Sequence, residues 1–150
     1  MTRWCVIPLV LLISGCGGRP DELTPYLEKF ATLDEFHEKF VRYEIYLGNP
    51  ALERQARDIR EVLQKYKDTL ESFGSTKNKF INAGHNTVKR AAARSLTQLV
   101  DPDFPTFTVS AKKQVAGIKL AVRDHYENLE KQWLKAGKTD PFPLKWPESE

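Results

Sequence analysis

Two polar side chains, His37 and Glu44, fall inside an apolar helical stripe near the start of the chain. At about 100° per residue, their spacing places both side chains nearly in line on one face of a helix, two turns apart. A carboxylate on a buried face is costly unless another group is bonded to it, and imidazole and carboxylate groups are both metal ligands. Together with His125 from a later helical segment, the pair could form a metal or small-ligand site inside a helical bundle.

A structural role is the alternative for the same residues. Glu44 lies near the end of its segment, where side chains reach water, and a basic side chain or a tyrosine hydroxyl could also bond to it. His37 could be a hydrogen-bonded residue at the boundary of the core. The pattern departs from ferritin-like di-iron sites, which use pairs of Glu-x-x-His motifs, because the comparable residues here are Asp34 and His37.

Motifs for other chemistry are missing from the sequence. It contains no Gly-x-Ser-x-Gly nucleophile elbow, no Cys-x-x-Cys-His haem attachment and no glycine-rich phosphate loop after a strand. Its 20 acidic residues always provide some pair of carboxylates, but none stands out as a glycosidase pair. We therefore expect a protein that is not an enzyme, and an enzyme acting on cell-wall material is a weaker alternative.

The clearest charge feature is a stretch between Glu71 and Asp101 that has no acidic residue. Its basic residues are Lys77, Lys79, Lys89, Arg90 and Arg94. The last three point away from the apolar stripe, so this face could contact anionic lipid headgroups, lipopolysaccharide, a cell-wall polymer or an acidic protein. Alternatively, Glu127 and Glu130 on a neighbouring helix balance a solvated basic face. A net charge of +3 is too small to indicate nucleic acid.

Residues 1–18 have the order of an export signal. Arg3 provides a positive start, and residues 4–13 form an apolar run that is much shorter than the about 20 residues of a membrane span. The following residues, Ile13-Ser14-Gly15-Cys16, resemble the lipobox of bacterial lipoproteins. The resemblance implies cleavage before Cys16, with covalent diacylglycerol and N-acyl lipid on that residue and no other cofactor. An ordinary cleaved signal is the alternative, since Ser14 and Gly15 would also suit its cleavage site.

The lipobox resemblance also implies a location. The protein would be anchored in a bacterial membrane, and Gly17 after the cysteine favours the outer membrane, facing the periplasm, in a Gram-negative cell. Cleavage would leave about 135 residues, which is one domain's worth of chain. Cys5 would leave with the signal and Cys16 would carry lipid, so the domain would have no disulfide and would depend on packing.

Hydrophobic periodicity predicts four helices, over residues 25–47, 50–73, 77–99 and 110–136. Thr24 is the expected N-cap of the first helix, with Pro25 in the first helical position. Gly84 lies on the third apolar face, where a small residue lets another helix approach closely, and Gly137 is the expected C-cap of the fourth helix. The pattern predicts an all-α fold, an antiparallel four-helix bundle. Its parts are a signal peptide at 1–15, a lipidated tether at 16–24, the bundle at 25–137 and a Pro-rich tail at 138–150.

Aromatic residues crowd the first predicted helix in greater number than one stripe can bury: Tyr26, Phe30, Phe36, Phe40, Tyr43 and Tyr46. They could form a binding patch, or the tail could cover them with its own aromatic residues, Phe142 and Trp146. The whole pattern favours a lipid-anchored interaction or assembly factor of the cell envelope, whose partner is an envelope protein or an anionic polymer. A metal-binding or ligand-binding bundle is the alternative.

Overall fold

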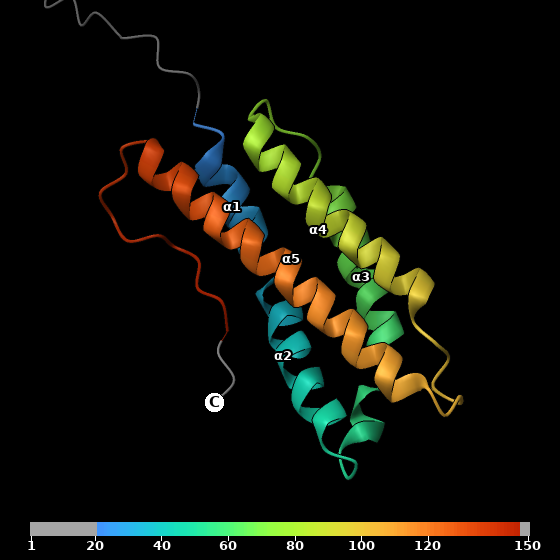
Figure 1. The fold of residues 1–150 in the computed structure, drawn as a ribbon. Helices are drawn as coiled ribbons and strands as arrows, with labels where there is room; N and C mark the ends of the chain where they lie inside the picture. Colours follow the sequence, from blue (N-terminus) through green and yellow to red (C-terminus); the bar gives the residue numbers. More distant parts are fainter. Residues whose placement is uncertain (1–20, 148–150) are drawn as a thin grey trace, which may run out of the picture.

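The computed structural model describes residues 21–147, and in this span the chain is all-α (Figure 1). The helices are α1 (Leu23–Ala31), α2 (Asp34–Gly48), α3 (Ile59–Ser72), α4 (Lys79–Gln98) and α5 (Phe107–Lys135), with a short 3-10 helix, η1 (Glu53–Ala56), before α3. The described residues include no strand, so the predicted all-α class is confirmed. None of the helices from residue 21 to 147 is both long enough and apolar enough to span a bilayer. The lipobox and Cys16 lie outside the described residues.

The first predicted helix is broken in the middle, so the prediction of one helix over 25–47 is wrong there. The Thr32 hydroxyl donates to the Lys29 carbonyl at 2.6 Å. The backbone amides of Thr32 and Leu33 donate to the carbonyls of Lys29 and Phe30, three residues back, which makes a tight turn. A threonine that bonds to the preceding turn competes with the regular helical hydrogen bonds. Leu33 is fully buried at the break, so packing of its side chain holds the bend in place.

The start of α1 also differs from the prediction. The helix begins at Leu23, and the Asp21 carboxylate accepts hydrogen bonds from the Leu23 amide at 3.1 Å and from the Thr24 hydroxyl at 2.7 Å. Asp21 therefore supplies the acceptor expected of Thr24, because an aspartate oxygen is a better acceptor for the free amides of a first turn. The last residues of the predicted 16–24 tether are consequently helical.

The predicted start of the second helix at residue 50 is wrong. The chain after Asn49 first forms a turn and η1, and α3 begins only at Ile59. The Asn78 side chain caps α4 by accepting from the Phe80 and Ile81 amides at 3.0 and 3.3 Å. In contrast, α5 begins earlier than predicted, at Phe107. The 50–73, 77–99 and 110–136 segments are thus helical over most of their length.

The long helices α4 and α5 lie side by side and run in opposite directions, with α3 beside α4 and α2 beside α5 (Figure 1). Small residues permit the close contact: Ala92 of α4 and Ala111 of α5 are fully buried, as are the larger Val88 and Ile118. Gly84 touches α5 directly, because a Cβ built on it would lie only 2.6 Å from Cε1 of His125. The close approach expected at Gly84 is therefore present.

The tail after α5 packs along the bundle instead of leaving it (Figure 1). Gly137 takes a positive φ of 73° and ends the helix, as predicted. The Trp133 indole then donates to the Asp140 carbonyl at 2.9 Å, and Leu144 is buried. Trp146 lies with its ring centre 5.4 Å from that of His37. Most aromatic residues of the first segment are core residues, and the described part of the tail covers the side where His37 lies.

Candidate functional site

All three histidines of the chain are buried, and each is hydrogen-bonded to a tyrosine. His37, His85 and His125 are 0, 5 and 2% exposed. They come from α2, α4 and α5, and the tyrosines that bond to them come from α1, α3 and α5. The polar core of this bundle therefore joins all five α-helices of the described chain.

Tyr26 links two of these histidines. Its hydroxyl lies 3.1 Å from Nδ1 of His85 and 2.7 Å from Nε2 of His125. Nδ1 of His125 has no partner, and a bare acceptor costs less there than a buried N–H without an acceptor, so the proton of the His125 ring is on Nε2. The Tyr26 hydroxyl must then donate to His85 Nδ1, and the tyrosine oxygen must accept from the Nε2–H of His125.

This assignment leaves Nδ1 of His125 as a bare lone pair, and it is the one buried side-chain nitrogen or oxygen among residues 21–147 without a hydrogen-bond partner. An unpaired acceptor is the less costly choice, since a buried N–H without an acceptor is rarer in proteins. The atom faces the backbone of Gly84, where a side chain has no room. Burial, with a smaller effect from nearby His85, lowers the pKa of His125 to about 3, so the ring is neutral.

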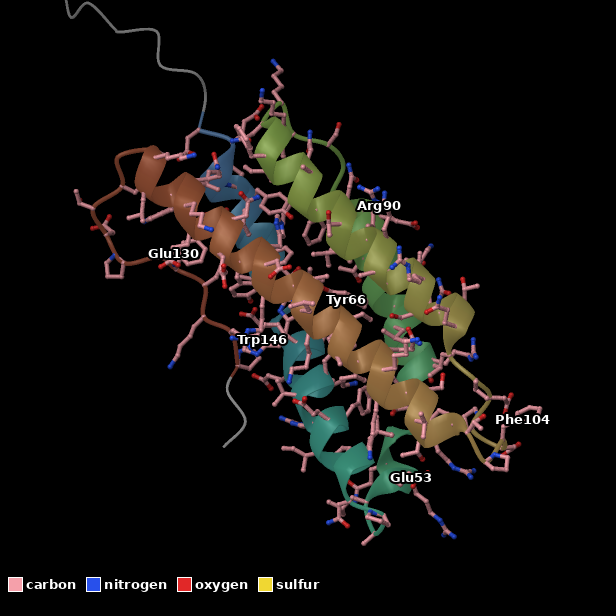
Figure 2. The ribbon with its side chains drawn as sticks, in the orientation of Figure 1. Glu53, Tyr66, Arg90, Phe104, Glu130 and Trp146 are labelled. Carbon is pink, nitrogen blue, oxygen red and sulfur yellow. The ribbon has the colours of Figure 1, made fainter. Side chains whose placement is uncertain are left out.

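A second cluster surrounds His37. Its Nε2 lies 3.1 Å from the Tyr66 hydroxyl, and its Nδ1 lies 3.3 Å from the Tyr126 hydroxyl. Tyr126 donates to the Asp34 carboxylate at 3.2 Å, so its oxygen accepts from Nδ1–H of His37. The Tyr66 hydroxyl, in the middle of the bundle (Figure 2), then donates to Nε2, and every polar atom of His37 is bonded.

Electrostatics favour neutral rings and neutral phenols throughout this core. Burial lowers the pKa of His37, although the neighbouring Asp34 partly opposes the shift. Burial also lowers the pKa of His85 and raises the pKa values of Tyr26, Tyr66 and Tyr126. Burial therefore favours the neutral form of each histidine and of Tyr26, Tyr66 and Tyr126. The arrangement is thus one of structural hydrogen bonds.

The proposed metal set of His37, Glu44 and His125 is not brought together. Glu44 is exposed, and its carboxylate pairs with the ammonium group of Lys119 on α5. His37 and His125 are both in the core, but their ring nitrogens are bonded to different tyrosines, and Phe30 lies against both rings. No group of three candidate ligands of suitable geometry occurs in the described part of the chain. Glu44 does not face the core; as the structural alternative has it, its side chain reaches water, and a basic side chain bonds to it.

The tyrosines were missed as functional neighbours of the histidines, although a signal for them existed. Tyr26, Tyr66 and Tyr126 each stand in an apolar stripe, where a hydroxyl needs a hydrogen-bond partner as much as an imidazole does. Which tyrosine bonds to which histidine depends on how the helices pack.

The basic face of α4 carries charge without a counter-charge. Lys77, Lys79, Arg90 and Arg94 are exposed and Lys89 is half-buried. None of the five forms an ion pair with any residue between 21 and 147, and Glu127 and Glu130 do not balance them. Arg90 lies on the outward side of α4, whereas Glu130 lies on the side of α5 nearer the tail (Figure 2).

The five basic residues divide into two groups along α4. Lys77 precedes α4 and Lys79 is its first residue, and this end lies beside the start of α1, because the Asn78 amide donates to the Glu22 carboxylate at 2.9 Å. The second group, Lys89, Arg90 and Arg94, is about 15–22 Å farther along the helix axis, at about 1.5 Å per residue. A single flat partner would therefore have to cover most of the helix to contact both groups.

Comparison with protein-family models, with curated proteins and with solved structures finds no match for this chain.

Proposed function

We propose that this chain is a lipid-anchored helical bundle of the bacterial cell envelope, attached through Cys16, that acts as a non-enzymatic interaction or assembly factor. Its anionic partner, an envelope protein or a polymer, binds the basic patch formed by Lys89, Arg90 and Arg94 on α4. The observation that carries this proposal is that these three residues stand on a helix without any acidic residue and form no ion pair with the described chain.

The density of positive charge supports an anionic partner. α4 has no acidic residue at all, so no carboxylate of its own helix can pair with the basic patch. Positive charges close together on one helix face repel one another, and this repulsion is reduced when a bound partner supplies negative charge. Because the Debye length is about 8 Å at physiological ionic strength, binding to such a patch should weaken steeply as salt is added.

The core supports a scaffold in place of a reaction centre. Its imidazole and phenol groups bond to one another, and burial keeps them neutral. The chemically versatile side chains are therefore used to fix the positions of the helices. A rigid bundle of this kind presents its surface residues in a constant arrangement.

The anchor is tested by replacing its cysteine. Cys16→Ser should abolish acylation and move the protein from the membrane fraction to the aqueous fraction of fractionated cells, or leave it with an intact leader. Cys5→Ser is the matched control and should stay processed and membrane-bound. Mass spectrometry of the purified wild type should show acyl chains at residue 16, and an unmodified thiol there would contradict the proposal.

The basic patch is tested by charge reversal and cross-linking in native membranes. The triple variant K89E/R90E/R94E should lose the partner that the wild type captures. A control triple, K112E/K113E/R123E, changes the same charge at exposed basic residues of α5 that have no ion pair within the described chain, and it should retain the partner. Both variants should unfold at nearly the wild-type temperature. Equal capture by the two triples would refute the basic patch as the binding surface.

A further inference from the structure

We infer that the end of the bundle at which α4 begins rests on the anionic headgroup surface of the membrane that holds the anchor. The contact surface, here called the membrane-facing end, consists of Lys77, Lys79, Phe80 and Lys135. This inference depends on the proposed acylation of Cys16. It adds a second, separate surface to the basic patch of Lys89, Arg90 and Arg94.

The first argument is the short distance from the anchor to the described domain. Asp21 is the fifth residue after Cys16, and a chain extends at most about 3.6 Å per residue, so Asp21 lies within about 18 Å of the acylated residue. Asp21 is held to Lys138 by an ion pair of 3.0 Å, and Glu22 accepts from the Asn78 amide at 2.9 Å. These contacts join the start of α1 to the start of α4 and to the chain after α5.

The arrangement of the helices gathers these segments at one end. The first turn of α1, the first turn of α4 and the last turn of α5 lie together (Figure 1). The loop around Phe104 lies at the opposite end (Figure 2). An anchor attached before Asp21 therefore places the first end, and not the second, against the lipid.

The second argument is the chemistry of that end. Phe80 is large and apolar yet 49% exposed. The ammonium groups of Lys79 and Lys135 lie 5.4 and 5.8 Å from the centre of its ring. An apolar ring between lysines matches a bilayer interface, where the ring enters the boundary region and the ammonium groups contact anionic headgroups.

The charge at this end also favours a negative surface. The carboxylate of Asp21 pairs with Lys138, and that of Glu22 accepts from the Asn78 amide. Lys77, Lys79 and Lys135 form no ion pair with a described residue. Each lysine close to an anionic bilayer strengthens association by about fivefold, so three should contribute about a hundredfold.

The same geometry explains why the basic patch is left for another partner. With the membrane-facing end on the lipid, Arg90 and Arg94 stand about 16–22 Å farther along the axis of α4. That separation is about two Debye lengths or more at physiological ionic strength, so the headgroups attract the patch only weakly. The molecule would thus use its first turn of α4 for orientation and its outer turns for binding.

The experiment uses the protein as it is processed in cells, with its lipid on Cys16, reconstituted into vesicles. One set contains phosphatidylcholine alone, and the other contains about 30 mol % phosphatidylglycerol as the anionic lipid. Nitroxide labels are attached in separate proteins at Ser75→Cys, beside the membrane-facing end, and at Phe104→Cys, at the far end. Collision rates with oxygen and with a water-soluble nickel complex report the depth of each label.

In the anionic vesicles, the Ser75 label should be shielded from nickel and the Phe104 label should stay in water. The triple change K77E/K79E/K135E should lower the ratio of molecules with a shielded Ser75 label to molecules with an accessible one by at least about a hundredfold. The lipid should still keep the protein attached to the vesicle. The control K89E/R90E/R94E carries the same change of charge and should leave the Ser75 signal unchanged. Phe80→Ser should weaken the contact without changing the charge.

The outcomes separate this inference from the proposed function. If Cys16 is acylated and the Ser75 label is as accessible to nickel as the Phe104 label in anionic vesicles, only the membrane-facing end is refuted. If both triple variants shift the Ser75 label equally, the contact is not specific to this end and the inference also fails. An unmodified Cys16 thiol overturns both proposals.

Discussion

Replacing Gly84 by alanine tests the tightest contact in the bundle. The added Cβ would lie 2.6 Å from Cε1 of His125 and nearer still to Nδ1, whereas real Cβ atoms essentially never approach within 3.0 Å. His125 cannot simply rotate away, because its Nε2 lies 2.7 Å from the Tyr26 hydroxyl and its ring is buried. Either α4 must move away from α5 or the imidazole must leave Tyr26.

Three contributions decide the magnitude for Gly84→Ala. Overpacking a core costs about 1–3 kcal/mol. Losing the hydrogen bond to His125 and leaving a buried group unbonded costs about 1–3 kcal/mol. Alanine favours the helix over glycine by about 1 kcal/mol. The free energy of unfolding should therefore fall by about 1–5 kcal/mol, in spite of the better helix propensity.

Gly117 of α5 provides the matched control. It is exposed, and a Cβ built on it would meet nothing within 4 Å. Gly117→Ala should therefore stabilise the protein by about 1 kcal/mol, from the same helix propensity without the clash. Urea unfolding at neutral pH, monitored by circular dichroism, measures both changes in the free energy of unfolding.

A double-mutant cycle assigns the clash to the imidazole. In the His125→Ala background the imidazole ring is absent, so there is no clash. Adding Gly84→Ala to that background should therefore stabilise the protein by about 1 kcal/mol instead of destabilising it. If Gly84→Ala alone is as stable as the wild type, or if the cycle shows no coupling between the two positions, the reasoning about this contact is wrong.

Three further outcomes follow from the core and surface. Because burial holds the pKa of His125 near 3 in the fold, against about 6.5 unfolded, the unfolded state binds more protons below pH 6.5. The contribution of His125 to the free energy of unfolding should be complete above pH 6.5 and should fall by up to about 1.4 kcal/mol per pH unit as the pH drops toward 3. In His125→Gln, the urea midpoint should therefore change less between pH 7 and 5 than in the wild type. Tyr66→Phe should lower the free energy of unfolding in urea by about 1–3 kcal/mol, because it leaves Nε2 of His37 unbonded. Tyr46→Phe removes a hydroxyl that has no hydrogen bond to a described residue, so it should lower that free energy far less. Equal losses in the two variants would count against the network. Lys119→Ala should cost less than about 1 kcal/mol because its partner Glu44 is exposed, and a loss of several kcal/mol would show that this pair is part of the core after all.

The sequence by itself determined the class of fold and the segments that form it. Apolar residues at helical spacing predicted the four helical segments, although the first of them is two helices, α1 and α2, and Gly137 predicted the end of the last one. These features are local, since about 100° per residue defines a helical face without knowledge of its neighbours. For the same reason, Gly84 on an apolar face correctly indicated a close approach by another helix.

Only the tertiary structure decided which polar groups meet. Glu44 has the angular position of a core residue, but its carboxylate reaches Lys119, which lies far along the chain on α5. Tyr26 joins His85 to His125, and Tyr66 joins α3 to His37, across helices whose relative positions no local pattern specifies. Such pairs form when whole helices pack and bring distant side chains within about 3 Å, the distance that a hydrogen bond requires. Periodicity can therefore show that a buried polar group needs a partner, whereas the packing of the helices selects that partner.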